Sequence, residues 1–215
     1  EEEKLTKYLH EYLIFGGYPR VILENSYEEK KEILRDLAYS YIKKDVIEAG
    51  IRNDENFYLL LKILSQQIGN LVNFSELSLT LGVSRTMISN YFYVMEKSFH
   101  IQRIKPFYKN LRKEITRMSK IYFYDLGLRN FFYGNYDILL TRIDKGQLLE
   151  NFFFRHLLEE HYHDEIKYWR KINGGEVDFI VGKQAYEVKT NKNNINLKKY
   201  QNFKNKYPEI SLKFL

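Results

Sequence analysis

Three carboxylates and one lysine near the end of the chain have the types and spacing that metal-dependent phosphodiester hydrolysis requires. In the run Glu187-Val188-Lys189, the two charged side chains share one face of a strand, because successive strand side chains point to opposite faces. A hard divalent cation held by carboxylate oxygens can polarise a phosphate and activate water, and a lysine can stabilise the developing charge. We therefore predict that Glu150, Asp178 and Glu187 hold Mg²⁺ or Mn²⁺, with Lys189, Glu187 and Asp178 as catalytic residues.

A helix and a β-hairpin must position these side chains. Residues 176–181 and 185–190 have the composition of strands, joined through residues 182–184. An even-numbered tight loop would set Asp178 beside Glu187 or Lys189, whereas an odd-numbered loop would turn Asp178 away. Glu150 is expected on a helix that opens at residues 146–149. The same pattern also fits an ordinary solvated face of an antiparallel hairpin.

These residues resemble the PD-(D/E)XK nuclease superfamily over about residues 145 to 215. Glu150 matches its first-helix acid, Asp178 its second-strand acid, and Glu187-Val188-Lys189 its E-x-K, while Val177 stands at the position of the proline in its name. The resemblance implies an α/β nuclease-like fold with a mixed sheet and Mg²⁺-dependent cleavage of DNA. Relatives that keep this fold without activity are common, so a non-catalytic role stays open.

Composition narrows the classes of protein. The absence of cysteine excludes disulfides and thiolate metal sites, and no apolar run approaches the length of a membrane span, so we expect a cytoplasmic protein without a membrane partner. The net charge of +6 is uneven, because residues 51–120 hold 11 basic residues against 5 acidic ones. That asymmetry predicts DNA as a partner, although a modest basic excess is also found on ordinary surfaces.

The basic middle of the chain has the pattern of a helix-turn-helix. An apolar stripe ends near Gly69, Asn73 and Glu76 predict a capped helix that stops at Gly82, and Ser84 caps the next helix. A generic helical hairpin is the alternative, but it would not need this turn. The predicted buried positions are Leu77, Leu81, Val83, Ile88 and Met95. The predicted nucleic-acid-binding residues of the second helix are Arg85, Thr86, Ser89 and Asn90, with Tyr93 nearby.

A basic hairpin is expected after this helix. Residues 101–107 and 117–124 are rich in β-forming residues, and residues 101–120 hold seven basic residues against one acid. We interpret the hairpin as a wing that contacts a phosphate backbone, although a solvated loop and a protein-docking module are alternatives. The predicted contacts are Arg103, Lys105, Lys109, Arg112, Lys113 and Arg117.

The order of motifs suggests a second resemblance. Gly16-Gly17-Tyr18-Pro19, then residues 41–46, the winged helix, residues 124–129 and the nuclease-like end occur in sequence. This order is similar to the C-terminal part of prokaryotic AAA+ ATPases that end in a domain of unknown function. The resemblance implies a helical lid remnant and a missing N-terminal ATPase core as partner in a longer protein. No Gly-Lys-Ser or Gly-Lys-Thr is present, so we predict no ATP site in this chain.

The expected fold is α+β in three parts. Residues 1–52 would be a helical AAA+ lid-like segment, residues 53–125 a winged helix, and residues 126–215 a PD-(D/E)XK nuclease-like domain with a mixed sheet. The expected function is DNA binding with Mg²⁺-dependent endonuclease activity. The alternative is a non-catalytic DNA- or protein-binding adaptor with an inactive nuclease-like fold, for which the many aromatic residues leave surface for self-association.

Overall fold

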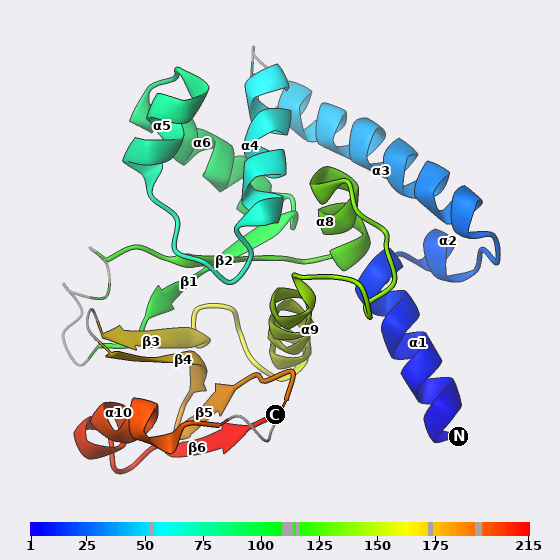
Figure 1. Ribbon diagram of the computed structural model, residues 1–215. Coiled ribbons are helices and arrows are strands. Elements are labelled where there is room, and N and C mark those ends of the chain that lie inside the picture. Colours follow the sequence, from blue (N-terminus) through cyan, green and yellow to red (C-terminus); the bar gives the residue numbers. More distant parts are fainter. Residues whose placement is uncertain (52–53, 109–113, 115–116, 172–173, 192–194) are drawn as a thin grey trace. The chain divides into compact units, whose positions relative to one another are not determined.

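The computed structural model describes residues 1–51, 54–108, 114, 117–171, 174–191 and 195–215. Backbone contacts divide the chain into two compact units (Figure 1). The first unit contains Glu1–Ile68, Asn73–Gln102 and Phe123–Ile143, and the second contains Gly69–Val72, Arg103–Tyr122 and Asp144–Leu215. In the part of the chain that is described, no helix is long and apolar enough to cross a membrane.

The first unit is helical, as its apolar periodicity predicts. Its helices are α1 (Glu2–Phe15), α2 (Pro19–Ile22), α3 (Tyr27–Glu48), α4 (Asp54–Gln66), α5 (Phe74–Leu81), α6 (Arg85–Lys97) and α8 (Leu126–Tyr133). On α4, the apolar residues Phe57, Leu60, Leu61 and Leu64, which recur at helical spacing, are completely buried. Helices α5 and α6 pack as a pair and correspond to the two helices expected on either side of Gly82.

Local capping explains where α5 and α6 begin and end. The side chain of Asn73 accepts hydrogen bonds from the backbone of Ser75 and Glu76, and that of Ser84 accepts one from the Met87 backbone. Gly82 closes α5 in the left-handed conformation, with φ of 64°. The predicted caps and turn are therefore confirmed.

The Gly-Gly-Tyr-Pro motif serves a close packing contact in the first unit. Asp125 caps α8 through the Leu128 backbone at 2.8 Å, and its other carboxylate oxygen accepts a hydrogen bond from the Gly17 backbone at 2.7 Å. Gly16 has φ of 76°, and a Cβ there would lie 2.2 Å from the Asp125 carboxylate. A side chain at Gly16 is thus excluded both by the Asp125 carboxylate and by backbone strain.

The β-strands form one mixed sheet in the order β2-β1-β3-β4-β5-β6. The strands are β1 (Ile101–Pro106), β2 (Lys120–Phe123), β3 (Lys167–Lys171), β4 (Gly174–Val181), β5 (Gln184–Glu187) and β6 (Ser211–Phe214). Strands β3, β4 and β5 are antiparallel neighbours, whereas β1 pairs with β3 and β5 pairs with β6 in parallel. The expected α+β class and mixed sheet are confirmed at this level.

The two strands expected as a wing belong to a larger sheet. They are neighbours in the sheet, as expected, but β1 also pairs with β3, with Lys105 opposite Lys167 and Pro106 opposite Tyr168. Because the end of β1 pairs with β3, the two strands continue the larger sheet. Most of the segment that joins them, residues 109–113 and 115–116, lies outside the described residues.

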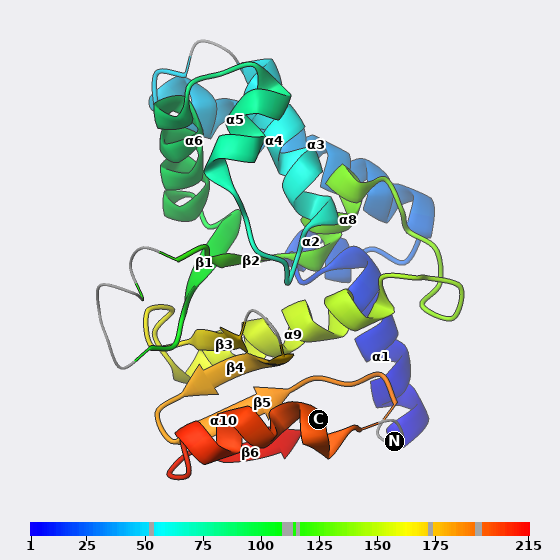
Figure 2. The ribbon, with the colours of Figure 1, turned by 60° about the vertical axis from the view of Figure 1, so that its left-hand side comes forward.

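Helices cover both faces of the sheet within the second unit (Figure 2). On one face, Phe154 and Leu157 of α9 (Lys145–Glu160) pack against Tyr122 and Phe179. The opposite face is covered by the short helices η2 (Leu197–Tyr200) and α10 (Gln201–Lys206), whose aromatic residues pack around Trp169. The sheet is therefore buried on both sides, and its polar residues must find partners there.

We expect the close approach at Gly127 to make this position intolerant of alanine. A Cβ at Gly127 would lie 2.0 Å from the carbonyl oxygen of Phe15, so Gly127→Ala should lower the free energy of unfolding by about 2–4 kcal/mol. Gly146→Ala is the matched control, because its nearest neighbour, a Thr190 methyl group, is 3.8 Å away. Urea unfolding of both variants measures the difference, and equal stabilities would show that the packing argument is wrong.

Candidate functional site

The β4–β5 hairpin sets Asp178 beside the Glu187-Val188-Lys189 run. Val181 pairs with Gln184 and Phe179 with Tyr186, so the loop holds two residues, and one further step in this register brings Asp178 opposite Glu187. Asp178 Oδ2 accepts a hydrogen bond from the Val188 backbone at 3.0 Å. The expectation for an even-numbered loop is therefore met.

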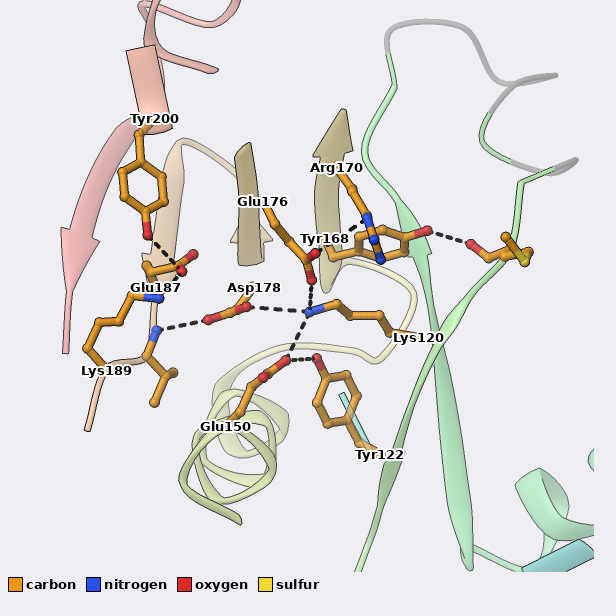
Figure 3. A network of polar contacts seen from close by, with 12 residues as sticks. Lys120, Tyr122, Glu150, Tyr168, Arg170, Glu176, Asp178, Glu187, Lys189 and Tyr200 are labelled. Atoms are coloured by element: carbon orange, nitrogen blue, oxygen red, sulfur yellow. Dashed lines mark hydrogen bonds and ion pairs between the residues drawn. The ribbon is translucent and has the colours of Figure 1, made fainter. Parts of the chain in front are cut away.

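A β-bulge lies in the stretch of β4 that carries Asp178. Trp169 pairs with Val177 and Lys167 with Ile180, so β4 advances three residues while β3 advances two. Such a bulge redirects a side chain relative to the regular alternation of a strand. Asp178 lies between two groups of charged residues, one around Glu187 and the other around Lys120 (Figure 3).

Glu187 forms the centre of the first group. Its Oε1 accepts hydrogen bonds from Lys189 Nζ at 2.5 Å and from the Tyr200 hydroxyl at 2.8 Å. Its Oε2 is buried and has no hydrogen-bond partner among the described residues. Burial and the charge of Asp178 raise the pKa of Glu187, although Lys189 and Tyr200 oppose the shift. An unpaired buried carboxylate oxygen is costly, so this atom is an available acceptor for a cation or a donor.

Lys120 of β2 forms the centre of the second group. Its ammonium lies 2.6 Å from Glu176 Oε1, 3.0 Å from Glu150 Oε1 and 3.4 Å from Asp178 Oδ1, and the residue is 1 % exposed (Figure 3). Burial alone would lower the pKa of Lys120, but the charges of the three carboxylates overcome this effect and leave its pKa raised. Lys120 is therefore a permanent cation inside the site.

Glu150 connects this group to α9. The Tyr122 hydroxyl donates a hydrogen bond to Glu150 Oε1 at 2.5 Å, and the same oxygen contacts Lys120. Burial raises the pKa of Glu150 to about 7, and Lys120 limits the shift. The Tyr122 pKa is also raised, first by burial and then by Glu150, so its hydroxyl remains a donor at neutral pH.

The charges of the site nearly balance. Four carboxylates, from Glu150, Glu176, Asp178 and Glu187, meet the cations of Lys120 and Lys189, and Arg170 Nε approaches Glu176 at 3.6 Å. Removing one partner of a buried ion pair leaves an uncompensated charge, which typically costs about 3–5 kcal/mol. The cluster therefore depends on each of its buried members.

The residues fit a divalent cation in part. Within the described ranges, no group of three or more histidine or acidic side chains converges closely enough to hold a metal. Lys120 occupies one oxygen each of Glu150 and Asp178, which are two of the three predicted ligands. Glu187 nevertheless offers its unpaired Oε2 next to Asp178, and acidic oxygens of this kind are the ligands that Mg²⁺ prefers. Among the described residues, Glu187 therefore offers a free oxygen to the ion, whereas Glu150 and Asp178 are engaged by Lys120 and Asp178 also by the Val188 backbone.

Four residues of the site were not anticipated from the sequence. They are Lys120, Tyr122, Glu176 and Tyr200. Lys120 and Tyr122 are two residues apart on a strand, and so are Glu176 and Asp178. Strand alternation therefore predicts that the members of each pair share one face of the sheet. Only the pairing of distant strands shows that the two pairs meet.

The predicted nucleic-acid-binding residues are distributed over both units. The α6 residues Arg85, Thr86, Ser89 and Asn90 are exposed in the first unit, together with Tyr93. In the second unit, Lys105 and Arg117 are exposed and Arg103 is half-buried. Lys109, Arg112 and Lys113 lie outside the described residues.

The raised pKa of Glu150 predicts a pH dependence of stability. The pKa of Glu150 is 4.5 in the unfolded chain and about 7 in the folded protein. Its contribution to stability is therefore fully present below about pH 4.5 and is lost as the pH rises through 7. When the pH rises from about 5 to about 8, the free energy of unfolding should therefore fall less for Glu150→Gln than for the parent. The difference should be on the order of 2 kcal/mol.

The matched control is Glu160→Gln on the exposed end of the same helix. Urea unfolding at both pH values provides the measurement. A parent-like pH dependence in Glu150→Gln would show that Glu150 is already ionised in the folded protein at low pH.

Two family models, both described as domains of unknown function, match parts of the chain. The family described as Domain of unknown function (DUF8612) matches residues 6–137, and Domain of unknown function (DUF4143) matches residues 145–215. Lys120 and Tyr122 fall in the first match and the carboxylates of the site in the second, so both matched regions contribute to the site.

Several prokaryotic proteins are similar to most of the chain. An uncharacterized protein of Methanocaldococcus jannaschii is 29% identical over 84% of this chain and 41% of its own length. An uncharacterized protein of Haemophilus influenzae is 26% identical over 83% of this chain and 44% of its own length. One from Mycobacterium bovis is 25% identical over 77% of this chain and 38% of its own length.

The chain thus spans less than half the length of these relatives. No solved structure matches it significantly. Because the first match extends over more than half of the residues, the chain belongs to the family of Domain of unknown function DUF8612.

Proposed function

We propose that the second unit is a nuclease-like module that cleaves DNA with a divalent cation. The observation that carries this proposal is the buried Glu187 carboxylate beside Asp178. One of its oxygens pairs with Lys189, and the other has no hydrogen-bond partner in the part of the chain that the structure describes. The acids on β4 and β5, with Lys189 just beyond the end of β5, provide both cation ligands and a positive group for the reacting phosphate.

The topology of the second unit supports the resemblance to the PD-(D/E)XK nucleases. Helix α9 is followed by the antiparallel strands β3, β4 and β5, then by the short helices and by β6 parallel to β5. Glu150 lies on this first helix, Asp178 on the second strand of the meander and Glu187 on the third. This is the order of helix, strands and acids that the resemblance implies.

Each residue of the site then has a role. Asp178 and Glu187 would hold Mg²⁺ or Mn²⁺, which when bound polarises the phosphate and activates water. Lys189 stays charged, because burial would lower its pKa but the hydrogen bond to Glu187 raises it. A permanently charged lysine acts as a stabiliser of developing negative charge and not as a general base.

The first unit supplies a surface for holding DNA. Helix α6 follows a short helix and a tight turn, and its exposed face displays Arg85, Thr86 and Asn90 without acidic residues in its first turn. Such a helix can lie in the major groove, with polar and basic groups contacting bases and phosphates. We assign to α5 and α6 the helix-turn-helix part of a winged helix.

The whole protein is proposed to be a prokaryotic AAA+ ATPase with this chain as its C-terminal region. The relatives are more than twice as long as the part that the chain matches, which leaves room for a further domain in them. The AAA+ part of the proposal rests on the order of motifs, from Gly-Gly-Tyr-Pro to the nuclease-like end. The ATPase core would be the partner of this region.

A second candidate function is a non-catalytic adaptor that binds DNA or protein. The observation that favours it is Lys120, which neutralises Glu150 and Asp178 without any metal. A nuclease-like fold whose acids are satisfied internally can persist as a scaffold for assembly. Cleavage assays separate the two candidates.

The nuclease proposal predicts that cleavage requires the charged residues of the hairpin. In Mg²⁺ or Mn²⁺, the parent should cut linear, single-stranded or branched DNA, and Asp178→Asn, Glu187→Gln and Lys189→Met should each reduce the rate by at least about a hundredfold. Lys183→Met is the matched control, because this lysine is exposed in the loop of the same hairpin. Gel electrophoresis of labelled DNA gives the rates.

The parent's own behaviour decides between nuclease and adaptor. A folded parent that binds DNA but leaves every substrate intact, in this chain and in the full-length protein, would support the adaptor. Cleavage that persists in all three hairpin variants would point to a contaminating enzyme and would remove support for the proposed site.

If α6 binds DNA, removing the charge of Arg85 should weaken the affinity for DNA, and the loss should depend on the salt concentration. Arg85→Ala should weaken duplex binding by about tenfold and reduce the slope of log affinity against log salt by about one, as expected for one phosphate contact. Lys62→Ala on α4 removes the same charge from an exposed position of the first unit away from α6. Fluorescence anisotropy at several salt concentrations measures both variants, and equal effects would indicate non-specific electrostatics only.

A further inference from the structure

Three carboxylates contact the ammonium group of Lys120. Glu176, Glu150 and Asp178 approach it to between 2.6 and 3.4 Å, from β4 and α9. The lysine is buried, and its neighbour two residues on, Tyr122, fixes Glu150 with a further hydrogen bond. The second unit therefore contains its own cation at the point where its acids meet.

Two of these three carboxylates, Glu150 and Asp178, are metal ligands predicted from the sequence, and Asp178 is also a ligand of the proposed nuclease. Glu150 and Asp178 each give Lys120 one oxygen, and Asp178 gives its other oxygen to the Val188 backbone. A divalent ion on the same oxygens would lie close to the ammonium and be repelled by it, because both are positively charged.

We infer that Lys120 is a built-in counter-ion of the site, which holds Glu150 and Asp178 in the absence of metal and competes with a divalent cation for them. This inference rests on the proposed function and adds a means of regulation to it. Lys120 is a positioning residue, since it contacts the acids and is too deeply buried to reach a substrate.

Glu176 can keep the Lys120 ammonium paired after the other two carboxylates bind a metal ion. It makes the shortest of the three contacts, at 2.6 Å, and is not one of the predicted metal ligands. When the other two carboxylates turn to a divalent ion, Lys120 keeps this ion pair, so no cation is left buried without a partner. Release of Lys120 from two acids is therefore compatible with its burial.

The test compares Mn²⁺ binding by the parent chain and by Lys120→Met, using isothermal titration calorimetry without DNA. The methionine has similar length and no charge, so the variant should bind Mn²⁺ at least about tenfold more tightly than the parent, because the competitor is gone. Arg170→Met is the matched control. It removes a cation that contacts Glu176 at 3.6 Å but has no described contact with Glu150 or Asp178.

Each result has a distinct meaning. Tighter Mn²⁺ binding by Lys120→Met but not by Arg170→Met supports direct competition. If the parent itself binds no Mn²⁺ in that case, the nuclease proposal for the parent fails and the inference stands. A parent that binds Mn²⁺ with no gain in Lys120→Met, or with an equal gain in Arg170→Met, overturns the inference and leaves the nuclease proposal intact. No binding by any of the three proteins overturns both.

A second measurement covers the case in which Lys120→Met does not fold. A crystal structure of the parent with Mn²⁺ should show the Lys120 ammonium still paired with Glu176 but more than about 4 Å from Asp178, beyond ion-pair distance. A bound Mn²⁺ on Asp178 and Glu187 with all three Lys120 contacts intact would overturn the inference. Absence of Mn²⁺ from the site at saturating concentration would count against both proposals.

Discussion

The clustering of two buried carboxylates, Asp178 and Glu187, with two partly buried ones, Glu150 and Glu176, is the constraint on which the rest of the second unit depends. A carboxylate without compensation cannot remain ionised in such a place, since desolvation costs several kcal/mol per charge. Lys120 and Lys189 supply the compensation from two sides, and Asp178 lies between them (Figure 3). Where compensation is incomplete, at Glu150 and Glu187, burial raises the pKa of the carboxyl group instead.

This constraint explains why β2 belongs to the sheet although it lies far upstream of α9. Strand β2 contributes Lys120 and Tyr122, and both contact Glu150. Without this strand, Glu150, Glu176 and Asp178 would share a buried space with no cation in contact with all three. The part of the chain that matches DUF4143, residues 145–215, therefore lacks two residues of its own charge network, which come from the part that matches DUF8612.

The first unit is held by a different kind of contact. Its backbone segments approach so closely at Gly16 and Gly127 that a single methyl group would collide with Asp125 or with the Phe15 carbonyl. Asn130 extends the same contact by donating hydrogen bonds to the carbonyl oxygens of Leu13 and Ile14. The Gly-Gly-Tyr-Pro and Asp125-Leu126-Gly127 motifs thus find a structural explanation in the docking of α1 against α8.

The sequence by itself determined the features that depend on neighbouring residues. Apolar periodicity and capping residues located α4, α5 and α6, because a helix is stabilised by contacts and hydrogen bonds within a few residues. Strand alternation and the short loop likewise brought Asp178 to Glu187 and Lys189, since hairpin register follows from loop length.

Tertiary structure decided everything that depends on strands distant in the sequence. The pairing of β1 with β3 joined the strands of the expected hairpin to a larger sheet, and this sheet brings Lys120 to carboxylates 30 to 58 residues away. No local pattern specifies such a neighbour, because strand pairing between remote segments is selected by the burial of whole faces and by the satisfaction of edge hydrogen bonds. For that physical reason the acids of the site could be named from the sequence, whereas the cation that holds them could not.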